Sequence, residues 1–161
     1  DETGGTQFDK LAEAGAKLLV ESLPHIFVGT AVYEKQPEES PTPYAGMITK
    51  QMGLINFGKS AAELERLVRG LNPWPSAFTF WNGKTLKVWE SFVVKSEEAG
   101  TEKPEPGTVV KTDKKGIYVA CGEDVLVLSQ VQLEGKKRMD ADAFLRGCHI
   151  ETGSRFTDKK E

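Results

Sequence analysis

The segment Asn72-Pro-Trp-Pro75 constrains the fold of this chain more than any other stretch. A helix cannot continue through two closely spaced prolines, because each one lacks a backbone N–H and disfavours helical geometry in the residue before it. The residues before this segment have helical spacing, and those after it are rich in β-formers. The sequence therefore predicts a change from helix to sheet at this joint.

The helix before the joint is predicted to begin at Ser60. Ser60 and Glu63 form an S-x-x-E capping box, in which each side chain accepts a hydrogen bond from a free backbone N–H of the first turn. Gly70 suits a left-handed cap, and Pro73 ends the helix. Its buried stripe consists of Leu64, Leu67, Val68 and Leu71.

Five short β-rich segments follow the joint. The first two, "SAFTFW" and "TLKVWESFVV", are separated by Asn82-Gly83, which favours a type I′ hairpin turn. The others are "GTVVK", "GIYVAC" and "VLVLSQVQL", and a short helix over Asp140–Leu145 comes after them. Hairpin spacing of this kind predicts a small barrel or a strongly curled sheet. The three tryptophans, Trp74, Trp81 and Trp89, could offer stacking surfaces for bases, but they are expected mainly in the core, with Trp74 under the joint.

The first forty residues have a different organisation. Thr6–Leu23 has the pattern of an amphipathic helix capped by Thr6 and closed by Pro24, and Ile26–Tyr33 is a candidate strand. One helix and one strand cannot bury two faces, so this part is expected to be the tail of a larger domain. The acidic, proline-rich stretch Glu34–Pro43 favours an extended connector.

Composition excludes several classes of protein. Hydrophobic residues make up 39% and charged residues 28% of the chain, which is a soluble globular balance. No apolar run approaches the ~20 residues that span a bilayer, and no secretory signal precedes the first helix. The chain starts at Asp1 without an initiator Met, so a truncated start is expected. Two unpaired cysteines fit a reducing cytoplasm, which is the expected location.

The sequence contains no motif for catalysis or metal binding. It has no nucleophile elbow, no phosphate-cradling glycine loop and no H-E-x-x-H motif. Two cysteines and two histidines lack metal-ligand spacing, so no metal is expected. Neighbouring acids such as Asp140 and Asp142 are interpreted as helix caps and solvated groups.

Basic residues are the main candidates for binding. Three adjacent cations in "GKKRM" can contact phosphates without reading bases, and Arg66 and Arg69 share a helix face. Each of them, taken alone, is equally well explained by solvation. The candidate set consists of Lys50, Arg66, Arg69, Lys84, Lys87, Lys136, Lys137 and Arg138.

The chain resembles the C-terminal part of the bacterial methionyl-tRNA formyltransferase family over nearly its whole length. The resemblance rests on "ELERLVRGLNPWPSAFTFWNGKTLKVWES", "PGTVV", "GIYVACGED", "LSQVQLEGKKRM" and "GSRF". Upstream, "TGGTQFDKLAEAGAKLLVESL" resembles the last long helix of the family's catalytic domain, and "PYAGMITKQMGLINF" resembles its linker. Lys50 matches a linker lysine, whereas Met47 stands where a second lysine is common.

The resemblance implies three parts. They are a remnant of a Rossmann-like catalytic domain over 1–40, a linker over 41–56, and an OB-like open β-barrel that binds tRNA over 57–161. It implies a parent enzyme that moves a formyl group from 10-formyltetrahydrofolate to the amino group of initiator methionyl-tRNA. The family's catalytic asparagine, histidine and aspartate lie upstream. The chain alone is therefore expected to hold no cofactor and to be inactive, with the catalytic domain and the tRNA as its partners.

Two other interpretations stay open. The chain could belong to a related formyltransferase or formyltetrahydrofolate hydrolase in which the barrel has no tRNA role. It could also be an independent protein-binding barrel. The Asn72–Pro75 joint together with "GKKR" favours the tRNA enzyme. The acidic insert Lys95–Glu105 would repel tRNA unless it points away from the basic residues.

Overall fold

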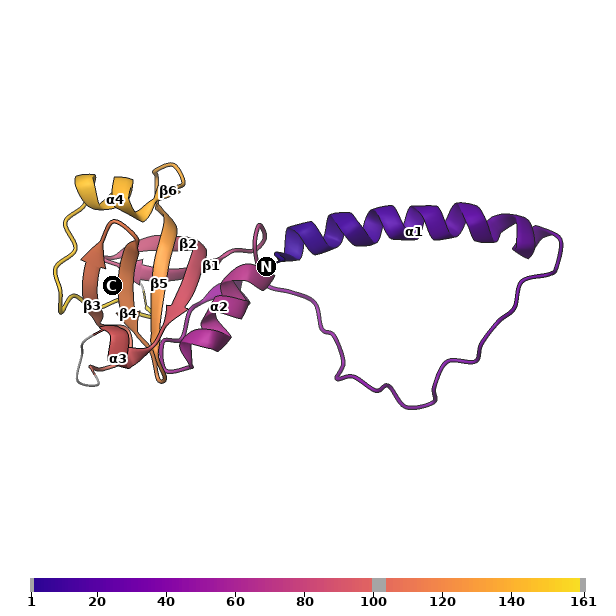
Figure 1. The fold of residues 1–161 in the computed structure, drawn as a ribbon, viewed down its shortest axis with the longest axis horizontal. Helices are drawn as coiled ribbons and strands as arrows, with labels where there is room; N and C mark the ends of the chain where they lie inside the picture. The colour runs from indigo at the N-terminus through magenta and orange to yellow at the C-terminus, as the bar shows by residue number, and fades with distance from the viewer. Residues whose placement is uncertain (1, 100–103, 160–161) are drawn as a thin grey trace.

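A computed structural model describes residues 2–99 and 104–159 of the chain. Figure 1 shows a β-sheet with helices around it and one long helix that extends away from it. The elements in chain order are α1 (Gly4–Phe27), η1 (Lys50–Gly53), α2 (Ala61–Gly70), β1 (Ala77–Trp81), β2 (Lys84–Val94), α3 (Ser96–Ala99), β3 (Val109–Asp113), β4 (Gly116–Ala120), β5 (Val125–Leu133), β6 (Met139–Asp140) and α4 (Ala141–Gly147).

All the strand pairs of the sheet are antiparallel. The strand order is β1-β2-β5-β4-β3, and β6 pairs with β5. The β1–β2 hairpin turns at Asn82 and Gly83, whose φ angles of 47° and 68° suit the predicted type I′ turn. The prediction of a mainly β fold with helices is confirmed, although the sheet is open and does not close into a barrel.

The segment Arg155–Thr157 lies between the two edge strands. Thr157 exchanges backbone hydrogen bonds with Phe80 on β1, at 3.0 and 3.1 Å. Arg155 forms an isolated bridge with Thr108, next to β3. One short segment therefore satisfies backbone groups beside both edges of the open sheet.

The core lies between one face of the sheet and α2. Leu64 and Val68 of α2 are buried there with Leu86 and Val88 of β2. The predicted capping box is present, because the Ser60 hydroxyl accepts from the backbone N–H of Glu63 and the Glu63 carboxylate accepts from Ser60. The helix ends without the expected left-handed glycine, and Leu71 at its C-cap has a φ of −96°.

The joint after α2 differs from its prediction in one respect. Trp74 was expected in the core, but its side chain is 58% exposed. Both X-Pro bonds of the joint, Asn72–Pro73 and Trp74–Pro75, are cis. Trp81 does pack against the core, with its ring 6.3 Å from that of Phe144 on α4. The tryptophan of the joint therefore faces solvent, and a tryptophan of β1 packs inside.

The first helix also corrects two expectations. Thr3 rather than Thr6 is its N-cap, and Thr6 takes the third position of the capping box. Pro24 lies inside α1 instead of ending it, and the strand expected over 26–33 is not formed. No residue of this helix is buried against the described part of the chain, and Phe8 is 72% exposed.

The chain from 28 to 49 has no helix or strand and is exposed almost throughout. It runs from the far end of α1 back towards α2 (Figure 1). From Ile55, which is 1% exposed, the chain packs against the sheet. The division into 1–40, 41–56 and 57–161 stays a prediction.

Candidate nucleic-acid interface

Two cations flank the indole ring of Trp89 on β2. Lys87 Nζ lies 5.6 Å from the ring centroid, and the guanidinium carbon of Arg138 lies 4.8 Å from it. Both distances are within the ~6 Å at which an aromatic ring attracts a cation. The indole Nε1 donates a hydrogen bond to Gln132 Oε1 at 3.2 Å, which fixes the orientation of the ring.

The strand pattern of β2 places these side chains outside the core. Leu86 and Val88 are buried, and alternation directs Lys87 to the opposite face of the sheet. The register with β5 is irregular between Val88 and Glu90, so Trp89 lies in a β-bulge. Alternation places Trp89 on the same face as Lys87, and the bulge increases the local twist of the strand at this point.

The loop between β5 and β6 is tied to the same part of the sheet. Gln132 Nε2 donates to the carbonyl oxygen of Lys136 at 2.9 Å, and the Glu134 carboxylate accepts from the backbone N–H of Thr85 at 2.9 Å. Lys136 and Lys137 are exposed on this loop. Their charges therefore lie beside the end of β2 that carries Lys87.

Arg138 is held by acceptors on two strands. Its Nη2 lies 3.1 Å from Glu90 Oε1 on β2, and its Nε donates to Gln130 on β5. Exposed ion pairs of this kind contribute about 0–1 kcal/mol, so a phosphate can replace the carboxylate at little cost. The guanidinium of Arg138 is therefore held over Trp89 and can still exchange the Glu90 carboxylate for a phosphate.

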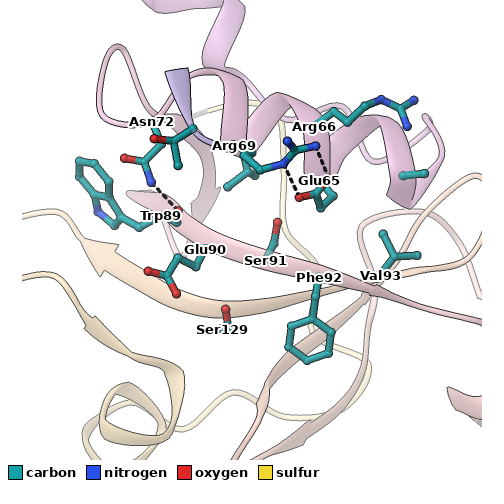
Figure 2. A pocket seen from close by; sticks show the side chains of 13 residues that line it. Glu65, Arg66, Arg69, Asn72, Trp89, Glu90, Ser91, Phe92, Val93 and Ser129 are labelled. Carbon is teal, nitrogen blue, oxygen red and sulfur yellow. Dashed lines mark hydrogen bonds and ion pairs between the residues drawn. The ribbon is translucent and has the colours of Figure 1, made fainter. Parts of the chain in front are cut away.

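A groove of about 800 Å³ lies between α2 and β2 (Figure 2). Trp89 lines its wall together with Arg66 and Arg69 of α2. Arg69 is engaged, since its Nε and Nη2 donate to the Glu65 carboxylate at 2.9 and 3.3 Å and its Nη1 donates to the carbonyl oxygen of Glu2 at 3.1 Å. Arg66 is exposed at the same groove.

The candidate cations are thus brought together in part. Lys87 and Arg138 contact Trp89. Lys136 and Lys137 follow on the adjoining loop, and Lys84 is the first residue of β2. These five cations are called the cation cluster. Arg66 and Arg69 join this surface through the groove. Lys50 is exposed on η1 and does not line that groove.

The described part of the acidic insert lies at the opposite end of β2. Lys95 follows the last residue of β2, whereas Lys84 is its first residue. Trp89, which Lys87 and Arg138 contact, is six residues before Lys95, and at ~3.3 Å per residue this corresponds to roughly 20 Å. Lys95 also pairs with Asp124, at 2.7 Å, which lowers the pKa of that carboxyl group. The start of the insert therefore lies away from Trp89.

Sequence reasoning offered Trp89 as a possible surface for base stacking but favoured the core for it. Its hydrogen-bond partners Gln132 and Asn72 were not considered. The spacing of two residues between Lys87 and Trp89 places them on one face of a strand and was the available signal. The approach of Arg138 has no such signal, because it depends on the pairing of β2 with β5.

Within residues 2–99 and 104–159, no three His, Cys, Asp or Glu side chains gather as metal ligands. Over the same ranges, no helix has the length and apolar character needed to cross a membrane.

Comparisons with known proteins agree with the sequence resemblance. The chain is 52% identical to a methionyl-tRNA formyltransferase of Agathobacter rectalis, over 98% of this chain and 49% of that protein. It is 46% identical to the Bacillus subtilis methionyl-tRNA formyltransferase, over 92% of this chain and 46% of that protein. The chain therefore spans about half the length of these relatives, and it matches their C-terminal half.

The fold is also found in a solved structure of HypX from Aquifex aeolicus. That structure matches 84% of this chain and 24% of its own length, with a TM-score of 0.57 and 13% identity. At this identity the likeness shows the fold alone. A family model described as formyl transferase, C-terminal domain, matches residues 47–149. The chain thus belongs to the formyl transferase C-terminal domain family.

Proposed function

We propose that this chain is the tRNA-binding part of a methionyl-tRNA formyltransferase of the bacterial cytoplasm. The parent enzyme transfers a formyl group from 10-formyltetrahydrofolate to the amino group of initiator methionyl-tRNA. The observation that carries the tRNA-binding role is the gathering of Lys87 and Arg138 around Trp89, beside the Lys136–Lys137 loop. The names of the relatives support the choice of RNA.

The arrangement suits the backbone of a folded RNA. Lysine and arginine neutralise phosphates and release counterions, which gives affinity without sequence readout. Trp89 offers an aromatic surface on which an unpaired base can stack, and Arg138 supplies the guanidinium plane that RNA-binding sites use in the same way. Arg66 extends the surface along the groove. Lys50, which lies on η1, would make a separate contact with the RNA.

Folate chemistry belongs to the other half of the parent enzyme. A HypX structure matched at TM-score 0.56 holds tetrahydrofolic acid, which supports a folate cosubstrate for this group of proteins. No residue of this chain is assigned to that cosubstrate. The exposed apolar residues of α1, among them Phe8 and Leu18, are the surface on which the catalytic half would pack. This chain alone would therefore bind tRNA without transferring the formyl group.

Salt dependence tests the proposal directly. The affinity of the chain for initiator tRNA is measured from low to moderate salt, for the native chain and for Lys136→Glu/Lys137→Glu. The slope of log affinity against log salt is expected to fall by roughly 2, because each lysine accounts for about one unit. The control is Lys114→Glu/Lys115→Glu, which makes the same charge change on the β3–β4 turn.

Three results would contradict the proposal. They are an affinity that does not respond to salt, an equal loss in the two double variants, and no binding at all. No binding would instead favour a related formyltransferase or formyltetrahydrofolate hydrolase whose C-terminal domain has no tRNA role.

A further inference from the structure

The C-terminal end of α2 meets the N-terminal end of α1 (Figure 1). The backbone N–H of Gly5, in the first turn of α1, donates to the carbonyl oxygen of Asn72 at 2.9 Å. The first N–H groups of any helix lack partners within the helix, and here one of them is satisfied from outside. The positive end of one helix dipole also faces the negative end of another, which stabilises the contact.

This contact requires glycine at two positions of α1. A Cβ atom added to Gly4 would lie 2.3 Å from the carbonyl oxygen of Gly70, and one added to Gly5 would lie 2.7 Å from Pro73 Cδ. Both distances are shorter than van der Waals contact allows. Gly15, in the middle of the same helix, has open space around it. The close approach of α2 therefore leaves no room for a Cβ atom at Gly4 or Gly5, whereas Gly15 has room for one.

Asn72 connects the helix contact to the cation cluster. Its main-chain oxygen accepts from Gly5, and its side-chain Nδ2 donates to the carbonyl oxygen of Trp89 at 3.0 Å (Figure 2). Arg69 adds a second link, since it donates to the carbonyl oxygen of Glu2 while it is held by Glu65. The start of α1 is thus hydrogen-bonded to the residue that also holds the bulge of β2.

We propose that Gly4, Gly5, Arg69 and Asn72 form a junction that fixes the orientation of α1 relative to the sheet. Residues 4–27 precede the part matched by the C-terminal domain family, 47–149, but lie within the match to whole formyltransferases. The inference rests on the proposed function, in which α1 belongs to the catalytic half. Gly5 and Asn72 are then positioning residues, because they set the angle between the catalytic half and the RNA-binding surface.

A distance measurement on this chain tests whether the junction exists. Nitroxide labels are placed at Glu21→Cys on α1 and Lys115→Cys on the β3–β4 turn, with Cys148→Ser, while the buried Cys121 is kept. Pulsed electron spin resonance is expected to give a narrow distance distribution. Gly4→Ala is expected to broaden it, because the added Cβ displaces the start of α1 from Gly70.

The matched control is Gly15→Ala. Both substitutions replace a glycine of α1 by alanine, which does not lower the helix propensity, so loss of α1 itself does not explain a difference between them. The control should keep the narrow distribution. A broad distribution in the native chain, or an unchanged one in Gly4→Ala, would overturn the junction.

A kinetic measurement on the whole enzyme tests the positioning role. A displacement of about 1 Å at a reacting centre costs on the order of 100-fold in rate, so Gly4→Ala should lower kcat by about 10- to 100-fold. The KM for initiator tRNA should stay within about twofold, because the cations are untouched. A change confined to KM, or a kcat equal to that of Gly15→Ala, would overturn the role.

The two proposals fail separately. If the chain does not bind initiator tRNA, the proposed function fails and the positioning role fails with it. The distance distribution still decides whether α1 is fixed to the end of α2, since that measurement involves no RNA.

Discussion

The guanidinium of Arg138 lies over the ring of Trp89, with its central carbon 4.8 Å from the ring centroid, although the two residues are far apart in the sequence. Antiparallel pairing of β2 with β5 and of β5 with β6 brings them together. The same ring has Lys87 5.6 Å away. A single aromatic side chain therefore organises charges from two separate segments.

Replacing Trp89 by leucine is expected to weaken tRNA binding about 5- to 150-fold, which corresponds to the roughly 1–3 kcal/mol of one stacked base. The control is Trp74→Leu, which removes a more exposed tryptophan that does not line the groove between α2 and β2. Filter binding at fixed salt gives both affinities. An equal loss in the two variants would mean that Trp89 has no special role.

Glu90→Gln is expected to tighten tRNA binding by up to about fivefold. The carboxylate of Glu90 competes with RNA phosphates for Arg138, and the exposed pair is worth no more than about 1 kcal/mol. Glu123→Gln, which removes the same charge beside the β4–β5 turn, is the control. Unchanged or weaker binding in Glu90→Gln would show that the ion pair does not restrain Arg138.

Leu64→Ala is expected to lower the free energy of unfolding by about 2–5 kcal/mol, because the leucine is fully buried between α2 and the sheet. Leu11→Ala makes the same change on α1, where the side chain is 62% exposed, and should alter stability by about 0.5 kcal/mol or less. Guanidinium unfolding followed by tryptophan fluorescence measures both. Similar losses would contradict the assignment of the core to α2 and the sheet.

Cys121 is expected to make stability fall as the pH rises from about 9 to about 11. Burial raises the pKa of its thiol from an ordinary 9.0 to about 11. The unfolded chain therefore loses this proton first, and stability that is present below pH 9 is lost up to pH 11. This difference of two pKa units corresponds to a loss of at most about 3 kcal/mol in the free energy of unfolding.

Chemical unfolding of Cys121→Ala across that pH range should show a shallower fall than the native chain. Cys148→Ala, which removes the other thiol of the chain, is the matched cysteine-to-alanine control. Parallel curves for the native chain and Cys121→Ala would rule out a contribution from this thiol.

Local signals in the sequence predicted local structure well. The Ser60 capping box and the Asn82–Gly83 turn depend on residues close in the chain, and both are present. The stop expected at Pro24 was wrong because the helix accommodates this proline one turn before its end. Trp74 was expected in the core because tryptophans near strands usually pack there, although the direction of a side chain in a joint depends on the surrounding elements.

The candidate surface could be predicted only as a set of residues. Lys87 and Arg138 were both named from charge, but their meeting at Trp89 depends on the strand order, in which β5 lies beside β2. Arg69 likewise donates to the main-chain oxygen of Glu2, which is distant in the sequence, whereas its other acceptor, Glu65, is one helical turn away. Spacing along the chain contains no information about such contacts.

The position of Arg155–Thr157 has a consequence for association between molecules. An open sheet presents unpaired N–H and C=O groups at its edge strands, and these can pair with the edge of another chain. Here Thr157 forms backbone hydrogen bonds with Phe80 on β1. In the same segment, Arg155 forms a bridge with Thr108, just before β3. A few residues thus shield both edges from intermolecular strand pairing, so the sheet remains open without acting as a template for aggregation.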